Sequence, residues 1–129
     1  MSKILILTPE QNFKEVEIKG RTVPYEVLRD SVGGLIELYN FSYELEKRGI
    51  DCFVDEEYLL KGNGRNPDKY TFVEISNNEK ILNIVLGNMV FCKTNFEGES
   101  LPLNNEDIEY IKKILSLKMP LWYWIIVDY

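Results

Sequence analysis

The longest apolar run of the chain, residues 81–93 (ILNIVLGNMVFCK), constrains the fold more than any other feature. A run of this kind has no polar face to turn toward water, so we interpret it as the central strand of a sheet. Gly87 interrupts the run. A glycine inside a strand pattern indicates a β-bulge or a close approach of another backbone.

Shorter strand patterns lie on either side of this run. Residues 3–7 (KILIL) are typical of a buried strand, and Val16 and Ile18 alternate with charged residues at the period of a half-buried strand. We expect these two segments to form an N-terminal hairpin across a turn at 9–12. Residues 35–39 and 70–75 are further predicted strands. Residues 42–46 and 50–55 are predicted to form a second hairpin around the turn 47–49.

Helix signals occur twice. Thr22 before Pro24 is a start signal, and Gly33 suits the left-handed residue that ends many helices, so we predict a helix over 23–32. Asn104 or Asn105 caps a second helix, which carries an apolar stripe and ends before Pro120. The predicted fold is therefore α+β, a small and mostly antiparallel sheet with two short helices in one domain, 1–129.

An alternative reading makes residues 34–48 one long helix that leads into the strand at 50–54. That order would give an α/β, Rossmann-like half of a glycosyltransferase. We rank it lower, because the order of motifs described below favours the first reading.

The C-terminal segment 118–129 is predicted to be an aromatic strand. Both of its faces are apolar, with Trp122 and Trp124 among its residues. A terminal strand of this kind lies either in the middle of a sheet or against another subunit. We therefore expect a homo-oligomer.

The residue inventory excludes several function classes. Among the 129 residues there is no histidine, which removes histidine-based catalytic triads and most zinc and iron sites. The two cysteines, Cys52 and Cys92, lie in strand-like apolar runs without zinc spacing, and we expect them to be free and buried in a reducing cytoplasm. No reactive arrangement is recognisable. We therefore expect a protein that binds rather than catalyses, with no metal and no cofactor.

The charge of the chain narrows the class of partner. The net charge is −6, and the 15 Lys and Arg residues are scattered along the sequence. A duplex nucleic acid or an anionic membrane would be repelled, so we expect neither as a partner.

Candidate ligand-binding residues come from three places. The loop 61–67 (KGNGRNP) could hold a phosphate with its backbone N–H groups and a guanidinium, although a plain surface turn is the commoner use of such a segment. The side-chain amide of Asn88 could face a ligand at the bulge, or it could make the hydrogen bonds that the bulge itself leaves open. Aromatic residues could stack on a base. The predicted ligand-binding residues are Arg65 of the loop or Arg29 for the phosphate, Asn63, Asn66 and Asn88 for polar contacts, and Phe91 or Tyr39 for stacking.

Five short motifs follow one another in a recognisable order. They are the box Val32-Gly33-Gly34-Leu35-Ile36-Glu37, the acidic turn 55–58, the loop 61–66, the strand signature Leu86-Gly87-Asn88-Met89-Val90-Phe91, and the pair of segments 97–99 and 105–108. In this order the chain resembles a phage and mobile-element family known only as a small domain of unknown function. Asp55 and Tyr58 depart from the family pattern, which has Asn and Gly there.

The resemblance implies a small α+β fold in a phage or prophage, without implying an activity. In size and character the chain is also similar to phage anti-defence sponges, which sequester cyclic nucleotide or cyclic ADP-ribose immune signals in the host cytoplasm. We therefore expect a nucleotide-like small molecule as ligand. The alternative is a protein-binding inhibitor of a host defence or regulatory protein.

Overall fold

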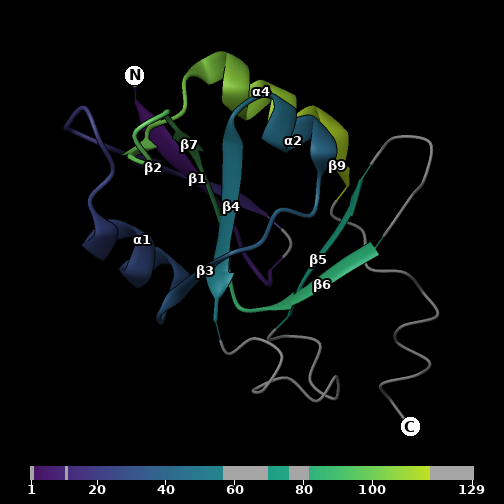
Figure 1. Cartoon of the computed structure of the whole chain (residues 1–129). Coiled ribbons are helices and arrows are strands. Elements are labelled where there is room, and N and C mark those ends of the chain that lie inside the picture. The colour runs from purple at the N-terminus through teal and green to yellow at the C-terminus, as the bar shows by residue number, and fades with distance from the viewer. Residues whose placement is uncertain (1, 11, 57–69, 76–81, 117–129) are drawn as a thin grey trace, which may run out of the picture.

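The computed structural model describes residues 2–10, 12–56, 70–75 and 82–116 (Figure 1). The predicted loop 61–67 and the aromatic segment 118–129 lie outside the described residues. The predicted oligomer, which rests on that segment, stays a prediction.

The larger sheet is antiparallel throughout. Its strands run in the order β2 (Phe13–Glu17), β1 (Lys3–Leu7), β7 (Met89–Thr94), β4 (Ile50–Asp55) and β3 (Ile36–Leu38), and the short β8 (Ser100–Leu101) also pairs with β7. The N-terminal hairpin is as predicted. Strand β7 lies in the centre, as expected for the second half of the longest apolar run.

A smaller antiparallel sheet stands beside the first. It contains β6 (Leu82–Leu86), β5 (Tyr70–Ile75) and β9 (Leu115–Ser116), in that order. Thr71, fully buried, donates a hydrogen bond to the carbonyl of Gly87, which lies between β6 and β7. The two sheets are therefore joined at the glycine that interrupts the apolar run.

Helices cover both faces of the larger sheet (Figure 1). The helix α1 (Tyr25–Val32) lies on one face, and α2 (Tyr43–Lys47) and α4 (Asn105–Ile114) lie on the other. Within the described residues none of the helices has the length and apolarity needed to span a membrane.

Strand alternation divides the core in two. On β1 and β7 the side chains of Leu5, Leu7, Met89 and Phe91 face α2 and α4. The residues between them, with Ile4, Ile6, Val90 and Cys92 among them, face α1. Because successive side chains of a strand point to opposite faces, a sheet covered on both sides needs continuous apolar strands, and this is why β1 and β7 read as unbroken apolar runs.

The structure confirms the α+β class and the mostly antiparallel sheet. The glycosyltransferase alternative is wrong, because every strand pair in the described residues is antiparallel and residues 34–48 contain β3 and α2 instead of one helix. The expected number of helices was also too low, since the described residues contain three.

The additional helix is α2, where the sequence predicted a strand at 42–46. Ser42 caps it by accepting a hydrogen bond from the N–H of Leu45, at 3.3 Å, and Gly49 follows it with φ of 80°. Leu45 is its buried residue. A helix this short buries too few side chains to show a helical period, and its sequence alternates as a strand does.

The run at 81–93 is two strands in two sheets, and not one strand with a bulge. Gly87 has φ of 85°, in the region that favours glycine, and turns the chain from β6 into β7. The prediction was correct for the central strand β7 and wrong for its continuity with β6.

Candidate functional site

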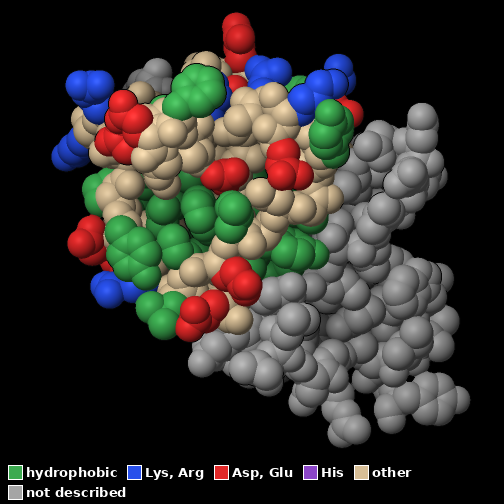
Figure 2. All heavy atoms as spheres, in the orientation of Figure 1, with side chains coloured by type: hydrophobic (Ala, Val, Ile, Leu, Met, Phe, Trp, Pro, Cys, Tyr) green, Lys and Arg blue, Asp and Glu red, His purple; other side chains and the backbone are tan. Residues whose placement is uncertain are grey.

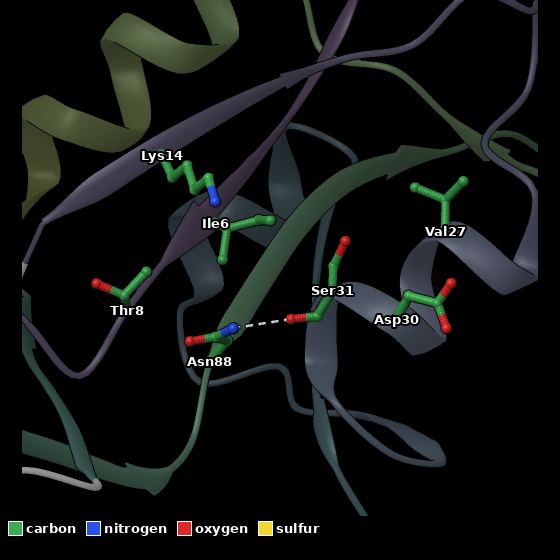
Figure 3. Close-up of a pocket in the computed structure, with 7 residues that line it drawn as sticks. All are labelled: Ile6, Thr8, Lys14, Val27, Asp30, Ser31 and Asn88. Carbon is green, nitrogen blue, oxygen red and sulfur yellow. Dashed lines mark hydrogen bonds between the residues drawn. The ribbon is translucent and has the colours of Figure 1, made fainter.

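A hollow of about 410 Å³ lies between α1 and the strands β1 and β2 (Figure 3). Lys14 lies on β2 and Asp30 on α1, and Asn88 directly precedes β7 and points toward Ser31 of α1. Its lining residues are Ile6, Thr8, Lys14, Val27, Asp30, Ser31 and Asn88. We call it the Asn88 pocket.

The amide of Asn88 holds the end of α1 in place. Its Nδ2 donates a hydrogen bond of 2.9 Å to the carbonyl oxygen of Ser31 (Figure 3). A Cβ on the preceding Gly87 would lie 4.0 Å from the carbonyl oxygen of Val32. Two of the motifs identified in the sequence, the Val-Gly-Gly box and the Gly-Asn signature, therefore meet here. The hydrogen bond that the Asn88 amide nitrogen donates stabilises the fold.

Of the other predicted ligand residues, the three that the structure describes, Arg29, Tyr39 and Phe91, do not line this pocket. Arg29 is exposed on α1, with its Nε 3.8 Å from a carboxylate oxygen of Asp30. Tyr39 is half-buried, and its ring stacks on that of Phe41 with centroids 5.6 Å apart. Phe91 is fully buried under α2 and α4, where a ligand approaching from solvent does not reach it. Asn63, Arg65 and Asn66 lie outside the described residues.

A second concentration of polar side chains surrounds Asp107, a buried carboxylate in the first turn of α4. Its Oδ2 accepts from the N–H of Asn104, and its own N–H donates to Oδ1 of Asn104, which together form a capping box. The same carboxylate pairs with two cations, Arg48 at 3.2 Å and Lys93 at 3.1 Å. Only 2% of the Asp107 side chain is exposed, against 36% for Arg48 and 32% for Lys93.

Two opposing effects act on the pKa of Asp107. Burial raises it, while hydrogen bonds from the backbone of Asn104 and from Lys93 and Arg48 lower it and prevail, so the pKa lies below its usual value. The carboxylate is therefore ionised at neutral pH. One negative charge shared between two positive ones leaves the trio with an excess of positive charge.

The side chain of Arg48 is held in one orientation. Its Nε bonds to Asp107, and its guanidinium carbon lies 4.5 Å from the centroid of the Tyr110 ring, a cation–π contact. The hydroxyl of Tyr110 in turn donates to Glu44, at 3.4 Å. Among the described residues, the terminal amino groups of Arg48 have no hydrogen-bond or ion-pair partner.

An open groove of about 570 Å³ runs past Arg48 and Lys93 toward the turn between β7 and β8. Lys47 adds a third cation to the lining and Glu46 a single carboxylate. Phe96 also lines the groove and is fully exposed. We call this the Arg48 groove, and its positive charge contrasts with the net charge of −6 of the whole chain.

The turn that carries Phe96 is fixed by Asn95. Its Oδ1 accepts from the N–H of Glu97 and of Glu99, at 3.0 and 2.9 Å, and its Nδ2 donates to the Glu99 carboxylate at 3.0 Å. Gly98 supplies the left-handed residue of the turn, with φ of 79°. The exposed ring of Phe96 is thus presented by a constrained backbone.

Sequence reasoning missed the residues of this groove. Lys47-Arg48 was interpreted as a hairpin turn, and Lys93 as the end of a strand. A partial signal existed, since Asp107 three residues after Asn104 is the spacing of a capping box, and a carboxylate in that position attracts cations. Nothing in the spacing of residues 48, 93 and 107 indicates that they meet.

The two cysteine thiols are poorly suited to nucleophilic chemistry. Burial raises the pKa of the Cys92 thiol to about 12 and that of the Cys52 thiol well above its ordinary value, so neither is a ready nucleophile. The two thiols point to opposite faces of the sheet and are free. The part of the chain that the structure describes contains no cluster of three or more side chains able to hold a metal ion.

Comparison with known proteins places the chain in a family. The model of the family described as "Domain of unknown function (DUF3846)" matches residues 1–116. The chain belongs to this family. The match confirms the resemblance to a small domain of unknown function, and the DUF3846 domain contains both cavities described above. No curated protein and no solved structure matches the chain.

Proposed function

We propose that this DUF3846 protein binds and sequesters a nucleotide-derived small molecule in the Arg48 groove, as an anti-defence sponge of phage or prophage origin acting in the host cytoplasm. A cyclic nucleotide or a cyclic ADP-ribose immune signal is the kind of ligand meant. The observation that carries the proposal is the side chain of Arg48, oriented by Asp107 and Tyr110 beside Lys93.

The cations of the groove suit a phosphate. An arginine fixed at Nε presents its terminal amino groups as a rigid pair of donors, which matches two phosphate oxygens. Lys93 is held against the same carboxylate, so the two cations lie close together before any ligand arrives. Little side-chain entropy is then lost on binding, which favours affinity.

Phe96 suits a base. Stacking of a base on an aromatic side chain contributes about 1–3 kcal/mol and tolerates any base, since each has a π-face. The ring is fully exposed on a turn that Asn95 constrains, and it lines the same groove as Arg48 and Lys93. A phosphate at Arg48 and a base at Phe96 together describe a nucleotide.

The Asn88 pocket supports the proposal less well. The described residues of its lining pair one cation, Lys14, with one anion, Asp30, and include no aromatic residue. Its amide already donates to Ser31. A phosphate therefore meets more favourable charge in the Arg48 groove, and the predicted roles of Arg29 and Asn88 stay untested predictions.

The proposed action is retention of the ligand without turnover. The sequence contains no histidine. The buried thiols have raised pKa values. An inhibitor that sequesters a signal needs only affinity and abundance, and the groove offers fixed charges and an aromatic ring.

Thermal unfolding with a panel of cyclic nucleotides, linear dinucleotides and ADP-ribose derivatives tests the proposal. A ligand present at 100 times its Kd stabilises the folded state by about 2.7 kcal/mol, which raises the melting temperature by several degrees. We expect one member of the panel to do so. If no member stabilises the protein, the proposal fails.

Charge-matched variants locate the site. Lys47→Gln and Arg29→Gln each remove one exposed positive charge, the first in the groove and the second on α1. We expect Lys47→Gln to weaken binding several-fold and Phe96→Ser to weaken it about 10-fold, through the lost stacking. Arg29→Gln should leave the affinity unchanged. Equal loss in Lys47→Gln and Arg29→Gln would contradict binding in the groove.

A protein-binding inhibitor is the second candidate, and an apolar strip favours it. On the face that α1 covers in part, Ile36 and Leu38 of β3 lie beside Phe53 of β4. Half of the Leu38 side chain is exposed, and Figure 2 shows hydrophobic side chains gathered over α1 and these strands, with Lys and Arg toward the margins. Stoichiometric capture of a host protein, lost in Leu38→Asp and kept in Phe96→Ser, would favour this function over nucleotide binding.

A further inference from the structure

Arg48 borders more than the groove described above. It also lines a small hollow of about 260 Å³ with Glu44 and Tyr110, and a larger one of about 550 Å³ that runs along α4 past Glu106 and Glu109. We call the larger one the α4 hollow. Arg48 therefore borders both the groove, whose lining includes Phe96, and the α4 hollow, whose lining includes Tyr110.

The α4 hollow differs in chemistry from the groove. Tyr110 and the aliphatic stems of the charged residues make its lining mostly apolar. Glu106 and Glu109 place two carboxylates on it and Lys113 one cation. Carboxylates repel a phosphate but accept hydrogen bonds from amino groups, such as those on the edges of nucleobases. The α4 hollow therefore suits a base and does not suit a phosphate.

The volumes point in the same direction. Ligand pockets are typically about 300–1,000 Å³, and the groove and the α4 hollow each reach that range alone. A single nucleotide with its phosphate at Arg48 and its base on Phe96 would fill the groove and leave the α4 hollow empty. A second nucleoside joined to the same phosphate would place its base in the α4 hollow.

We infer that the ligand is a dinucleotide, two nucleosides joined through phosphate, with the phosphate at Arg48 and Lys93, one base against Phe96 and the other in the α4 hollow. This inference rests on the proposed function. It adds the ligand class and a second set of contact residues, Tyr110, Glu106 and Glu109.

Titration calorimetry with two pairs of probes of equal charge tests it. Cyclic AMP and the dinucleoside monophosphate ApA each carry one phosphodiester charge, as do cyclic GMP and GpG. In at least one pair we expect the dinucleotide to bind about 10-fold more tightly or better, because the second base adds a stacking contact. Equal affinity within both pairs would overturn the inference and leave the proposed function intact. Absence of binding by all four probes would also overturn the inference, whereas the proposed function is decided by the wider panel of the thermal test.

Variants in the α4 hollow give an independent result. Glu109→Trp and Asn105→Trp each place a large side chain on its exposed rim, away from the ion pairs of Asp107. We expect both to reduce the affinity for the dinucleotide to that of its cyclic mononucleotide, whose own affinity stays unchanged and shows that the protein is folded. A dinucleotide affinity that neither variant lowers would overturn the inference.

Discussion

Asp107 is the residue that connects the stability of the protein to its proposed binding. It caps α4 and holds Arg48 and Lys93 on one carboxylate. The ion pairs are partly exposed, so their contribution to stability is smaller than that of a fully buried pair. Their other effect is positional, since they fix two cations at the wall of the groove before a ligand binds.

Replacement of Asp107 by Asn keeps the shape of the side chain and removes its charge. We expect a loss of about 1–2 kcal/mol in unfolding free energy at neutral pH, the usual scale for charged hydrogen bonds that are partly solvated. Urea unfolding of the variant and the wild type measures it. Glu106→Gln, on the exposed neighbour, serves as the control and should change stability by less than about 0.5 kcal/mol.

The same pair of proteins tests the pKa of Asp107. Since the folded-state pKa lies below the unfolded value of about 3.9, the ionised carboxylate stabilises the folded state fully at pH values above that value. The contribution disappears as the pH falls through the folded-state pKa. The stability difference between wild type and Asp107→Asn should therefore be constant from pH 7 to about pH 5 and shrink below about pH 4. A difference that grows toward acid would contradict the assignment.

At the scale of elements, the end of α1 is set by a glycine in the left-handed region. Gly33 has φ of 90°, and its N–H donates to the carbonyl of Arg29 at 2.8 Å, one turn back. A Cβ placed on Gly33 would meet no atom within 4 Å, so the requirement for glycine is one of backbone conformation alone. The Asn88 amide then binds the Ser31 carbonyl just before this turn.

Gly33→Ala tests this requirement. We expect a loss of about 1 kcal/mol, the cost of a left-handed alanine, and a smaller loss for Gly33→Asn, because asparagine tolerates that region better. Chemical denaturation measures both. Gly20→Ala is the matched control, since Gly20 has no positive φ and a Cβ there would make ordinary contacts at 3.6 Å. Equal losses in Gly33→Ala and Gly33→Asn would point to a steric cause instead.

Most elements of the fold were predictable because each buries one face, so that apolar residues recur along it at a regular spacing. The alternation around Val16 and the capping residues around Asn104 each identified an element correctly. The helix α2 was missed, because its five residues bury Leu45 alone and alternate like a strand. The separation of β6 from β7 was also missed, since an apolar run does not indicate which of two sheets each half joins.

At the scale of the whole molecule, the Arg48 groove depends on the topology of the sheet. Arg48 and Asp107 are 59 positions apart in the sequence, and they meet because α2 and α4 cover the same face of the sheet. No local pattern carries that information. Phe91 shows the converse case, because a strand residue that was expected to stack on a ligand is buried once β7 becomes the central strand.

The distribution of charge also appears only at this scale. The scattered basic residues in an acidic sequence predicted no duplex nucleic acid as partner, yet the fold gathers Lys47, Arg48 and Lys93 around one groove. Such a local positive site in a negative molecule favours a small anion over a long polyanion, which would also meet the acidic surface around it.

Native mass spectrometry of the purified protein, mixed with an excess of the dinucleotide that stabilises it most, tests the central claim most directly. We predict that each chain gains the mass of one ligand, and that the mixture still contains only intact ligand after prolonged incubation. Product molecules outnumbering the protein chains would show turnover and contradict the claim, and so would a protein that gains no mass at all.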